Sequence, residues 1–221
     1  MTDRPEDPNV PDEDRTPLQP AQALFDALGI AYEEAFAASE AHHASLRWLL
    51  DELVPGSRVL DVGSGTGRPT AETLSSAGHS VLGIDISPVM VDLATRQVPD
   101  AEFRCGDIRA VALSDSSFDA VCVYFALLQM SREEQVSLVT RLARTVKPGG
   151  RMVLATVPVD VEGAEFVFMD HPVRATSFAR DDFVALVTDA GLTVRSEESL
   201  LFTPSRPDAE PEPHLFLYCE R

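Results

Sequence analysis

Residues 59–68, which read VLDVGSGTGR, constrain the fold of this chain more than any other stretch. The stretch begins as a short apolar run rich in β-branched residues and continues with glycines at three alternate positions, Gly63, Gly65 and Gly67. Such a run is typical of a buried strand, and glycines allow positive φ angles and a close approach of the backbone to a ligand. Because residues 69–77 suit a helix, the sequence predicts a strand, a ligand-binding turn and a helix N-terminus.

The charge at the strand end indicates which ligand this turn binds. A dinucleotide turn reads G-x-G-x-x-G, but here the third glycine comes one residue early and Arg68 occupies its place. The carboxylate of Asp61 would repel a pyrophosphate, whereas it would attract a ligand that carries an ammonium and a sulfonium group. S-adenosylmethionine is such a ligand.

The acid and the three glycines resemble the first motif, D/E-x-G-x-G-x-G, of the class I S-adenosylmethionine-dependent methyltransferases. Further landmarks follow in the family's order: a second strand over residues 79–85, a third over 101–108, a fourth over 117–124 and a fifth over 152–157. Residues 142–151 resemble the family's R-x-L-K-P-G-G segment, which leads to the fifth strand. The resemblance covers about residues 55–157.

The positions after the strands supply the expected cofactor contacts. Asp85 ends the second strand 18 residues after Gly67, close to the spacing at which a carboxylate reaches the ribose hydroxyls. The resemblance implies that Asp107 accepts from the adenine amine and that Met90 and Ile108 flank the ring. The full set of expected cofactor-binding residues is Asp61, Gly63, Ser64, Gly65, Gly67, Asp85, Ile86, Met90, Asp107, Ile108, Tyr124 and Tyr32.

The catalytic residues are less well defined. Many members of the resembling family carry a histidine pair after the fourth strand, but residues 125–130 read FALLQM here. This leaves Tyr124 and Gln129 at the pocket edge, and Tyr124 is one of two catalytic candidates. The other is His171, paired with Asp170, which is the best remaining candidate for a general base, and a plain loop histidine is the alternative. Tyr32, His42 and His43 are further pocket candidates, for which packing on the sheet or a solvated helix face is the other interpretation.

These patterns together predict an α/β, Rossmann-like three-layer sandwich. Its seven-stranded, mostly parallel sheet has the expected order 3-2-1-4-5-7-6 and is preceded by a helical cap. Residues 1–19 are expected to be a disordered acidic tail. Residues 20–221 are expected to form one methyltransferase domain with three parts: the cap (20–54), the cofactor-binding core (55–157) and a last part (158–221). This last part is expected to contain a mixed substrate loop and a closing hairpin of two strands, 192–202 and 214–219.

Composition excludes several function classes. The net charge of −18 disfavours nucleic acids, because phosphate contacts require a basic face. No apolar run approaches the roughly 20 residues of a membrane helix, and we expect a cytoplasmic protein, monomeric or homodimeric. The three cysteines lie far apart without C-x-x-C spacing, so we expect buried thiols and no metal site.

The predicted function is methyl transfer from S-adenosylmethionine to a small molecule, with S-adenosylhomocysteine as the product. The helical cap, the acidic surface and a GC-rich coding signature, one lysine among 18 basic residues, favour a bacterial secondary metabolite as the acceptor. One alternative is a methyltransferase fold used without methylation, as a cyclase or a regulatory binder. The other alternative is an NAD-linked oxidoreductase, which Asp61 and Arg68 oppose.

Overall fold

A seven-stranded sheet is the centre of the structure, a computed structural model that describes residues 20–221. Its order is β3-β2-β1-β4-β5-β9-β8, which confirms the expected topology, because β8 and β9 are the two predicted closing strands. The predicted acidic tail, residues 1–19, lies outside the described residues. The sheet strands are β1 (Arg58–Val62), β2 (Ser80–Asp85), β3 (Glu102–Cys105), β4 (Phe118–Tyr124), β5 (Val146–Thr156), β8 (Thr193–Phe202) and β9 (Glu212–Glu220).

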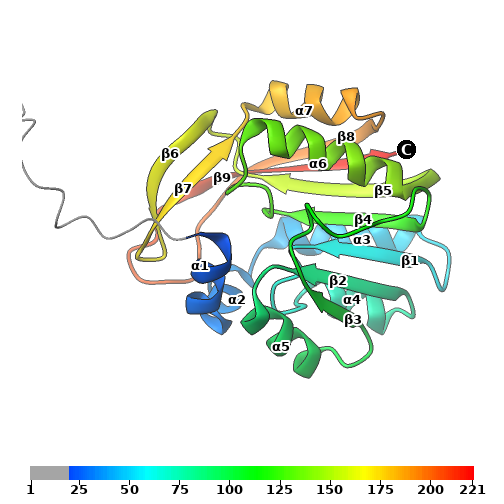
Figure 1. Cartoon of the computed structure of the whole chain (residues 1–221), viewed down its shortest axis with the longest axis horizontal. Helices are drawn as coiled ribbons and strands as arrows, with labels where there is room; N and C mark the ends of the chain where they lie inside the picture. The colour runs from blue at the N-terminus through cyan, green and yellow to red at the C-terminus, as the bar shows by residue number, and fades with distance from the viewer. Residues whose placement is uncertain (1–19) are drawn as a thin grey trace, which may run out of the picture.

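Helices cover both faces of this sheet and complete three layers (Figure 1). Leu46 and Leu49 of α3 and Leu74 of α4 are buried on one face, while Leu142 of α6 and Phe183 of α7 are buried on the other. None of the helices described between residues 20 and 221 has the length and apolar character needed to span a bilayer. The helices are α1 (Ala21–Leu28), α2 (Ile30–Phe36), α3 (Glu40–Glu52), α4 (Thr70–Ser76), α5 (Pro88–Gln97), α6 (Arg132–Thr145) and α7 (Arg180–Asp189).

Strand register brings the ends of the strands to one edge of the sheet. Strands β1, β2 and β4 run parallel, and Val62 at the end of β1 pairs with Ile84 and Val123. Strand β9 runs antiparallel to β5, and its Leu215 pairs with Thr156 at the end of β5. The first residues of β9 therefore lie at the same edge as the last residues of the parallel strands.

Residues 158–178 are not the mixed loop that the sequence predicted. They contain a second, two-stranded sheet of β6 (Val161–Phe168) and β7 (His171–Ser177). Phe168 pairs with His171 across a two-residue turn, in which Met169 and Asp170 have φ angles of 46° and 66°. Two positive φ angles match the right-handed twist of a hairpin, but this turn normally contains Asn-Gly or Asp-Gly. Because Met169 and Asp170 are not typical residues of such a turn, the sequence did not predict the hairpin.

The cap differs from the expected one in composition. Helices α1 and α2 lie with the β6–β7 hairpin at one end of the sheet (Figure 1), where Leu24, Leu28 and Val173 form a small buried cluster. The segment expected as a helical cap, residues 20–54, contains three helices, which are separated at Gly29 and before Ser39. Ser39 caps α3 by accepting from the His42 backbone N–H at 3.3 Å. Because α3 packs on the sheet, only α1 and α2 belong to the cap.

The cysteines agree with the sequence interpretation in part. Cys122 and Cys219 are buried in β4 and β9, whereas Cys105 at the end of the edge strand β3 is exposed. An edge strand has a neighbour on one side only, which leaves its last residue open to solvent. The expectation that all three thiols are buried is therefore wrong for Cys105.

Candidate functional site

The glycine turn after β1 is held against β2 and leaves one side open. The backbone N–H groups of Gly63 and Ser64 both donate to the Ile84 carbonyl, at 2.8 and 3.2 Å. Gly63 has a φ of 69°, and a Cβ there would lie 2.6 Å from the Cβ of Ala126. Gly65 has a φ of 51°, and a Cβ there would meet no atom within 4 Å. The turn thus needs glycine for its conformation and offers open space at Gly65.

Asp61 is a buried carboxylate beside this turn. Its side chain is 2% exposed, and among the described residues Oδ2 has no hydrogen-bond partner. Burial, and secondly the charge of Asp85, raise the pKa of Asp61 to about 7. Burying a charge without a partner is unfavourable, so this position fits a ligand that brings a positive group, such as the ammonium of S-adenosylmethionine.

Asp85 is oriented by the backbone. Oδ2 accepts from the Gly65 N–H at 2.8 Å and Oδ1 accepts from the Ser87 N–H at 2.9 Å. Burial raises the pKa of Asp85, and these hydrogen bonds oppose the shift. Each carboxylate oxygen can accept more than one hydrogen bond, so both remain able to accept from a pair of vicinal hydroxyls.

Three adjoining cavities meet at Tyr32 and Phe125, which line all of them. The turn cavity, of about 220 Å³, is bounded by the glycine turn, Asp61 and α3. The strand-end cavity, of about 110 Å³, lies between Asp85 and Asp107. The apolar cavity, of about 350 Å³, lies between the cap and the β6–β7 hairpin. A nucleoside with a charged tail can therefore occupy the first two cavities while the third stays accessible to another molecule.

Comparison with known proteins agrees with this geometry. Residues 59–150 match the family described as "Methyltransferase domain". The demethylmenaquinone methyltransferase of Renibacterium salmoninarum is 39% identical over 102 residues, which cover 46% of this chain and 42% of that protein. Residues 59–150 are thus similar to a methyltransferase domain. The chain spans less than half the length of this curated relative.

Solved structures share the fold of the methyltransferase domain at low sequence identity. The 1,6-didemethyltoxoflavin-N1-methyltransferase of Burkholderia thailandensis, solved with 1,6-didemethyltoxoflavin and S-adenosylhomocysteine, is 20% identical, with a TM-score of 0.68 over 94% of this chain and 92% of that chain. The [4+2]-cyclase SpnF is 19% identical, with a TM-score of 0.64 over 82% of this chain and 80% of that chain. Both confirm the fold class.

Most predicted cofactor residues of the methyltransferase domain line the two cavities. Gly67 is the exception: a Cβ there would lie 3.0 Å from Phe103 and 3.1 Å from Val98, so its lack of a side chain serves packing under the turn. The turn cavity is lined by Asp61, Gly63, Ser64, Gly65, Tyr32 and Tyr124. The strand-end cavity is lined by Asp85, Ile86, Met90, Asp107 and Ile108, together with Gly63, Gly65, Tyr32 and Tyr124.

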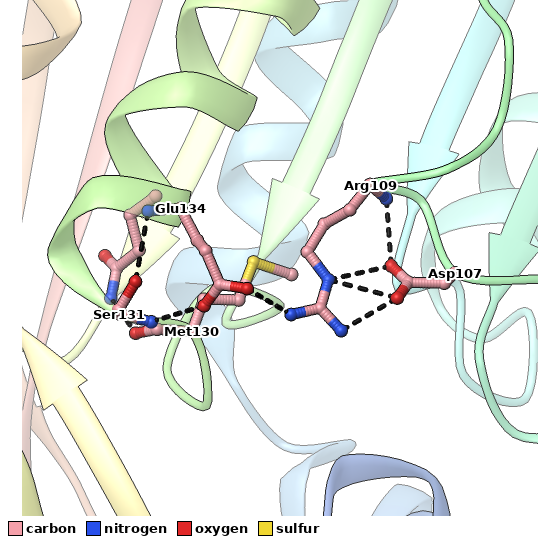
Figure 2. A network of polar contacts seen from close by, with 6 residues as sticks. Asp107, Arg109, Met130, Ser131 and Glu134 are labelled. Carbon is pink, nitrogen blue, oxygen red and sulfur yellow. Dashed lines mark hydrogen bonds and ion pairs between the residues drawn. The ribbon is translucent and has the colours of Figure 1, made fainter.

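Asp107, expected to accept from the adenine amine, is paired with Arg109 in the structure (Figure 2). Both of its carboxylate oxygens accept from Arg109, at 3.1 and 2.7 Å for Oδ2 and 3.0 Å for Oδ1, and this contact lowers the pKa of Asp107. Arg109 also donates to Glu134 at 2.6 Å, and Glu134 closes a capping box with Ser131 at the start of α6. An adenine amine would have to compete with Arg109 for this carboxylate.

Tyr124 is fixed by neighbouring side chains. Its hydroxyl shares a hydrogen bond with Ser45 at 2.7 Å, and burial raises its pKa well above the ordinary value. The His42 ring lies 3.9 Å from the Tyr124 ring, and its Nε2 is 2.9 Å from Thr70 Oγ1. Burial lowers the pKa of His42 to about 3. Tyr124 and His42 are therefore both neutral walls of the turn cavity near pH 7.

His171 does not occupy the position that its predicted role requires. It starts β7 beside the hairpin turn and is not among the residues that line the three cavities. Asp170, its expected partner, instead accepts from Arg206 at 2.7 Å. The difference follows from the hairpin, because Asp170 lies in its turn with a φ of 66° while His171 begins β7. His43 lines the turn cavity, but its Nε2 lies 3.0 Å from the Ala37 carbonyl.

Sequence reasoning missed two residues at the start of β9. His214 is 1% exposed and lines the turn cavity, and its Nε2 lies 2.7 Å from Glu212 Oε1. Glu212 itself lines the apolar cavity. Residues two apart on a strand point to the same side, so the pattern Glu-x-His within a strand was the available signal.

Proposed function

We propose that this protein transfers the methyl group of S-adenosylmethionine to a small apolar acceptor. The observation that carries the proposal is the buried, unpartnered Oδ2 of Asp61 beside the glycine turn. In this proposal Asp61 faces the ammonium, Asp85 accepts from the ribose hydroxyls, and Met90 and Ile108 flank the adenine. Gly63, Ser64 and Gly65 leave room for the methionine tail.

The apolar cavity supports the choice of acceptor. Aromatic and aliphatic side chains dominate its wall, and the few polar groups include Gln129 and Glu212. Its size is that of a small-molecule site, and a largely apolar wall favours a ring system or an alkyl chain. The Renibacterium relative is named for a quinone-type substrate, demethylmenaquinone, and an acceptor of similar apolar character would fit here.

A bacterial secondary metabolite is the finer form of this proposal. A cap built from α1, α2 and the β6–β7 hairpin provides a wall separate from the cofactor core, and the composition favours arginine over lysine. Both features suit a tailoring enzyme with its own acceptor.

The chain's contribution to the reaction is mainly positioning. Bound S-adenosylmethionine supplies an already activated methyl group for in-line displacement. Tyr32 and Phe125 lie where the three cavities meet, so they would hold the acceptor in line and exclude water. Holding two reactants in the correct geometry removes much of the entropic barrier.

Product analysis tests this function. The purified protein is incubated with S-adenosylmethionine and a panel of phenolic, quinol and heteroaromatic acceptors, and S-adenosylhomocysteine and methylated product are measured by mass spectrometry. We expect both products in equal amounts with at least one apolar acceptor. Conversion of an acceptor without S-adenosylhomocysteine would favour a cyclase, and cofactor binding without any conversion would favour a regulatory binder.

A further inference from the structure

Glu212 and His214 are placed at the site by the direction of β9. Strand β9 is antiparallel to β5, and its Leu215 pairs with the last residue of β5, Thr156. The residues before Leu215 therefore reach the edge of the sheet where the glycine turn lies. The pair stands between two cavities, because His214 lines the turn cavity and Glu212 lines the apolar cavity.

The pair has the geometry of an oriented histidine. His214 Nε2 lies 2.7 Å from Glu212 Oε1, while Nδ1 is buried and without a partner among the described residues. The ring lies between those of Phe125 and Phe202, with centroids 4.5 and 5.2 Å away. A buried polar nitrogen without a partner is unfavourable, and because His214 also lines the turn cavity, its Nδ1 can serve a ligand or a reacting group there.

The Glu212 contact determines which nitrogen can accept a proton. A carboxylate only accepts hydrogen bonds, so the imidazole must donate from Nε2, and neutral His214 then has its lone pair on Nδ1. Two titratable side chains near the pair, His42 on α3 and Tyr32 on α2, are neutral near pH 7. Asp61, whose pKa is raised to about 7, lines the same turn cavity as His214, together with Glu33, His43, Arg68, Glu72 and Tyr124. The neighbours from the β4 turn and β8, Phe125 and Phe202, carry no charge.

We propose that His214 is the general base of the methyl transfer and that Glu212 is its positioning residue. This proposal rests on the proposed function. As the acceptor's oxygen, nitrogen or carbon forms its bond to the methyl carbon, the carbon–sulfur bond breaks and its electron pair stays on sulfur. The proton that the acceptor loses passes to Nδ1 of His214, and Glu212 stabilises the resulting imidazolium.

Substitution of the pair tests the base. His214→Gln should lower kcat by about 10²-fold or more, the range for a general base, and should flatten the acid limb of the kcat profile against pH. Glu212→Gln should lower kcat by about 10-fold, with KM nearly unchanged. The matched control is His79→Gln, since His79 precedes β2 at the opposite edge of the sheet. Affinity for S-adenosylmethionine should stay within about twofold in all three variants.

The outcomes separate the two proposals. A wild-type protein that forms no S-adenosylhomocysteine with any acceptor overturns the proposed function and the base with it. An active wild type whose His214→Gln variant keeps its kcat and its pH profile overturns only the base. Nitrogen-15 NMR of the protein without acceptor gives an independent result. We expect the neutral imidazole of His214 to carry its proton on Nε2, and the opposite tautomer would overturn the assignment.

Discussion

At the scale of single residues, the environment of Asp61 opposes ionisation of its side chain. Burial raises the pKa of Asp61 from 3.8 to about 7. Between about pH 4 and pH 7 the carboxyl group is therefore protonated in the folded state but ionised in the unfolded chain. The stability that this proton provides is complete below about pH 4 and is lost as the pH rises through about 7. A shift of this size corresponds to as much as about 4 kcal/mol.

Replacing Asp61 with asparagine should therefore raise the stability of the fold but weaken binding of S-adenosylmethionine. At pH 8 the Asp61→Asn variant should unfold at a higher urea concentration than the wild type, with a free energy of unfolding that is larger by roughly 1–4 kcal/mol. This difference should vanish toward pH 4. Affinity for S-adenosylmethionine should fall at least about tenfold, because the ammonium loses its counter-charge. Equal stability at pH 8 would show that the carboxylate is not strained by burial.

Asp85 should contribute to cofactor affinity through its two oxygens. We expect Asp85→Ala to weaken binding of S-adenosylmethionine by about 1–3 kcal/mol, the effect of leaving buried hydroxyls without acceptors. Titration calorimetry measures this loss. Asp92→Ala on the exposed face of α5 is a suitable control, because Asp92 contacts only the neighbouring turn through Arg96. Wild-type affinity in the Asp85 variant would remove this residue from the site.

His171 distinguishes the sequence hypothesis from the structure. The sequence made it the best candidate for a base, whereas the structure places it beside the hairpin turn. We therefore expect His171→Ala to keep kcat and cofactor affinity within about twofold of the wild type. Steady-state kinetics at pH 7 and 8 provide the measurement, and a large loss of kcat would restore its predicted role.

Site residues at the ends of parallel strands could be predicted from the sequence, whereas site residues that reach the cavities only through tertiary strand pairing could not. Asp61 and Asp85 end parallel strands, so the strand pattern alone placed them at one edge. Glu212 and His214 reach that edge only because β9 runs antiparallel, and a proline-rich acidic segment precedes them. The Asp107–Arg109–Glu134 contacts likewise join segments that no local pattern connects.

At the scale of elements, the β6–β7 hairpin forms one wall of the apolar cavity. Phe168 ends β6 and its ring centroid lies 6.4 Å from that of Tyr32 and 6.1 Å from that of Phe36. We expect Phe168→Ala to raise KM for the acceptor by about 3- to 10-fold, because aromatic contacts of this kind contribute about 0.5–1.5 kcal/mol. Affinity for S-adenosylmethionine should not change. Acceptor kinetics and calorimetry measure the two quantities.

A second hairpin variant serves as the control. Glu165→Gln changes an exposed residue of β6 that pairs with Arg174 across the strands, at 3.3 Å. Exposed ion pairs contribute little to stability, so the acceptor kinetics of this variant should match those of the wild type. An equal rise in KM in both variants would mean that the hairpin acts through its overall stability rather than through Phe168.

Strands β1, β2 and β4 were predictable because each is a largely apolar, buried run followed by turn residues. The hairpin was not, since its turn residues, Met169 and Asp170, lack the usual glycine at a position of positive φ. The break between α2 and α3 was missed for a similar reason: Ser39 is a good helix cap, but no glycine or proline precedes it nearby.

At the scale of the whole molecule, the arrangement separates cofactor from acceptor. The parallel strands and the glycine turn bound the turn and strand-end cavities, while the cap and hairpin bound the apolar cavity. The cofactor side is formed largely by residues 59–150, the segment that matches the methyltransferase domain family. The acceptor side depends on segments outside the matched residues 59–150, which explains why the sequence predicted the cofactor better than the acceptor.

Calorimetric titration of the whole protein with S-adenosylmethionine tests whether the cavities around Asp61 and Asp85 bind this nucleoside. We expect one saturable site per chain, with an affinity that strengthens as the pH rises through about 7 and Asp61 ionises. NAD, titrated under the same conditions, should give no binding heat. Absence of a site for S-adenosylmethionine, or saturable binding of NAD in its place, would contradict the account.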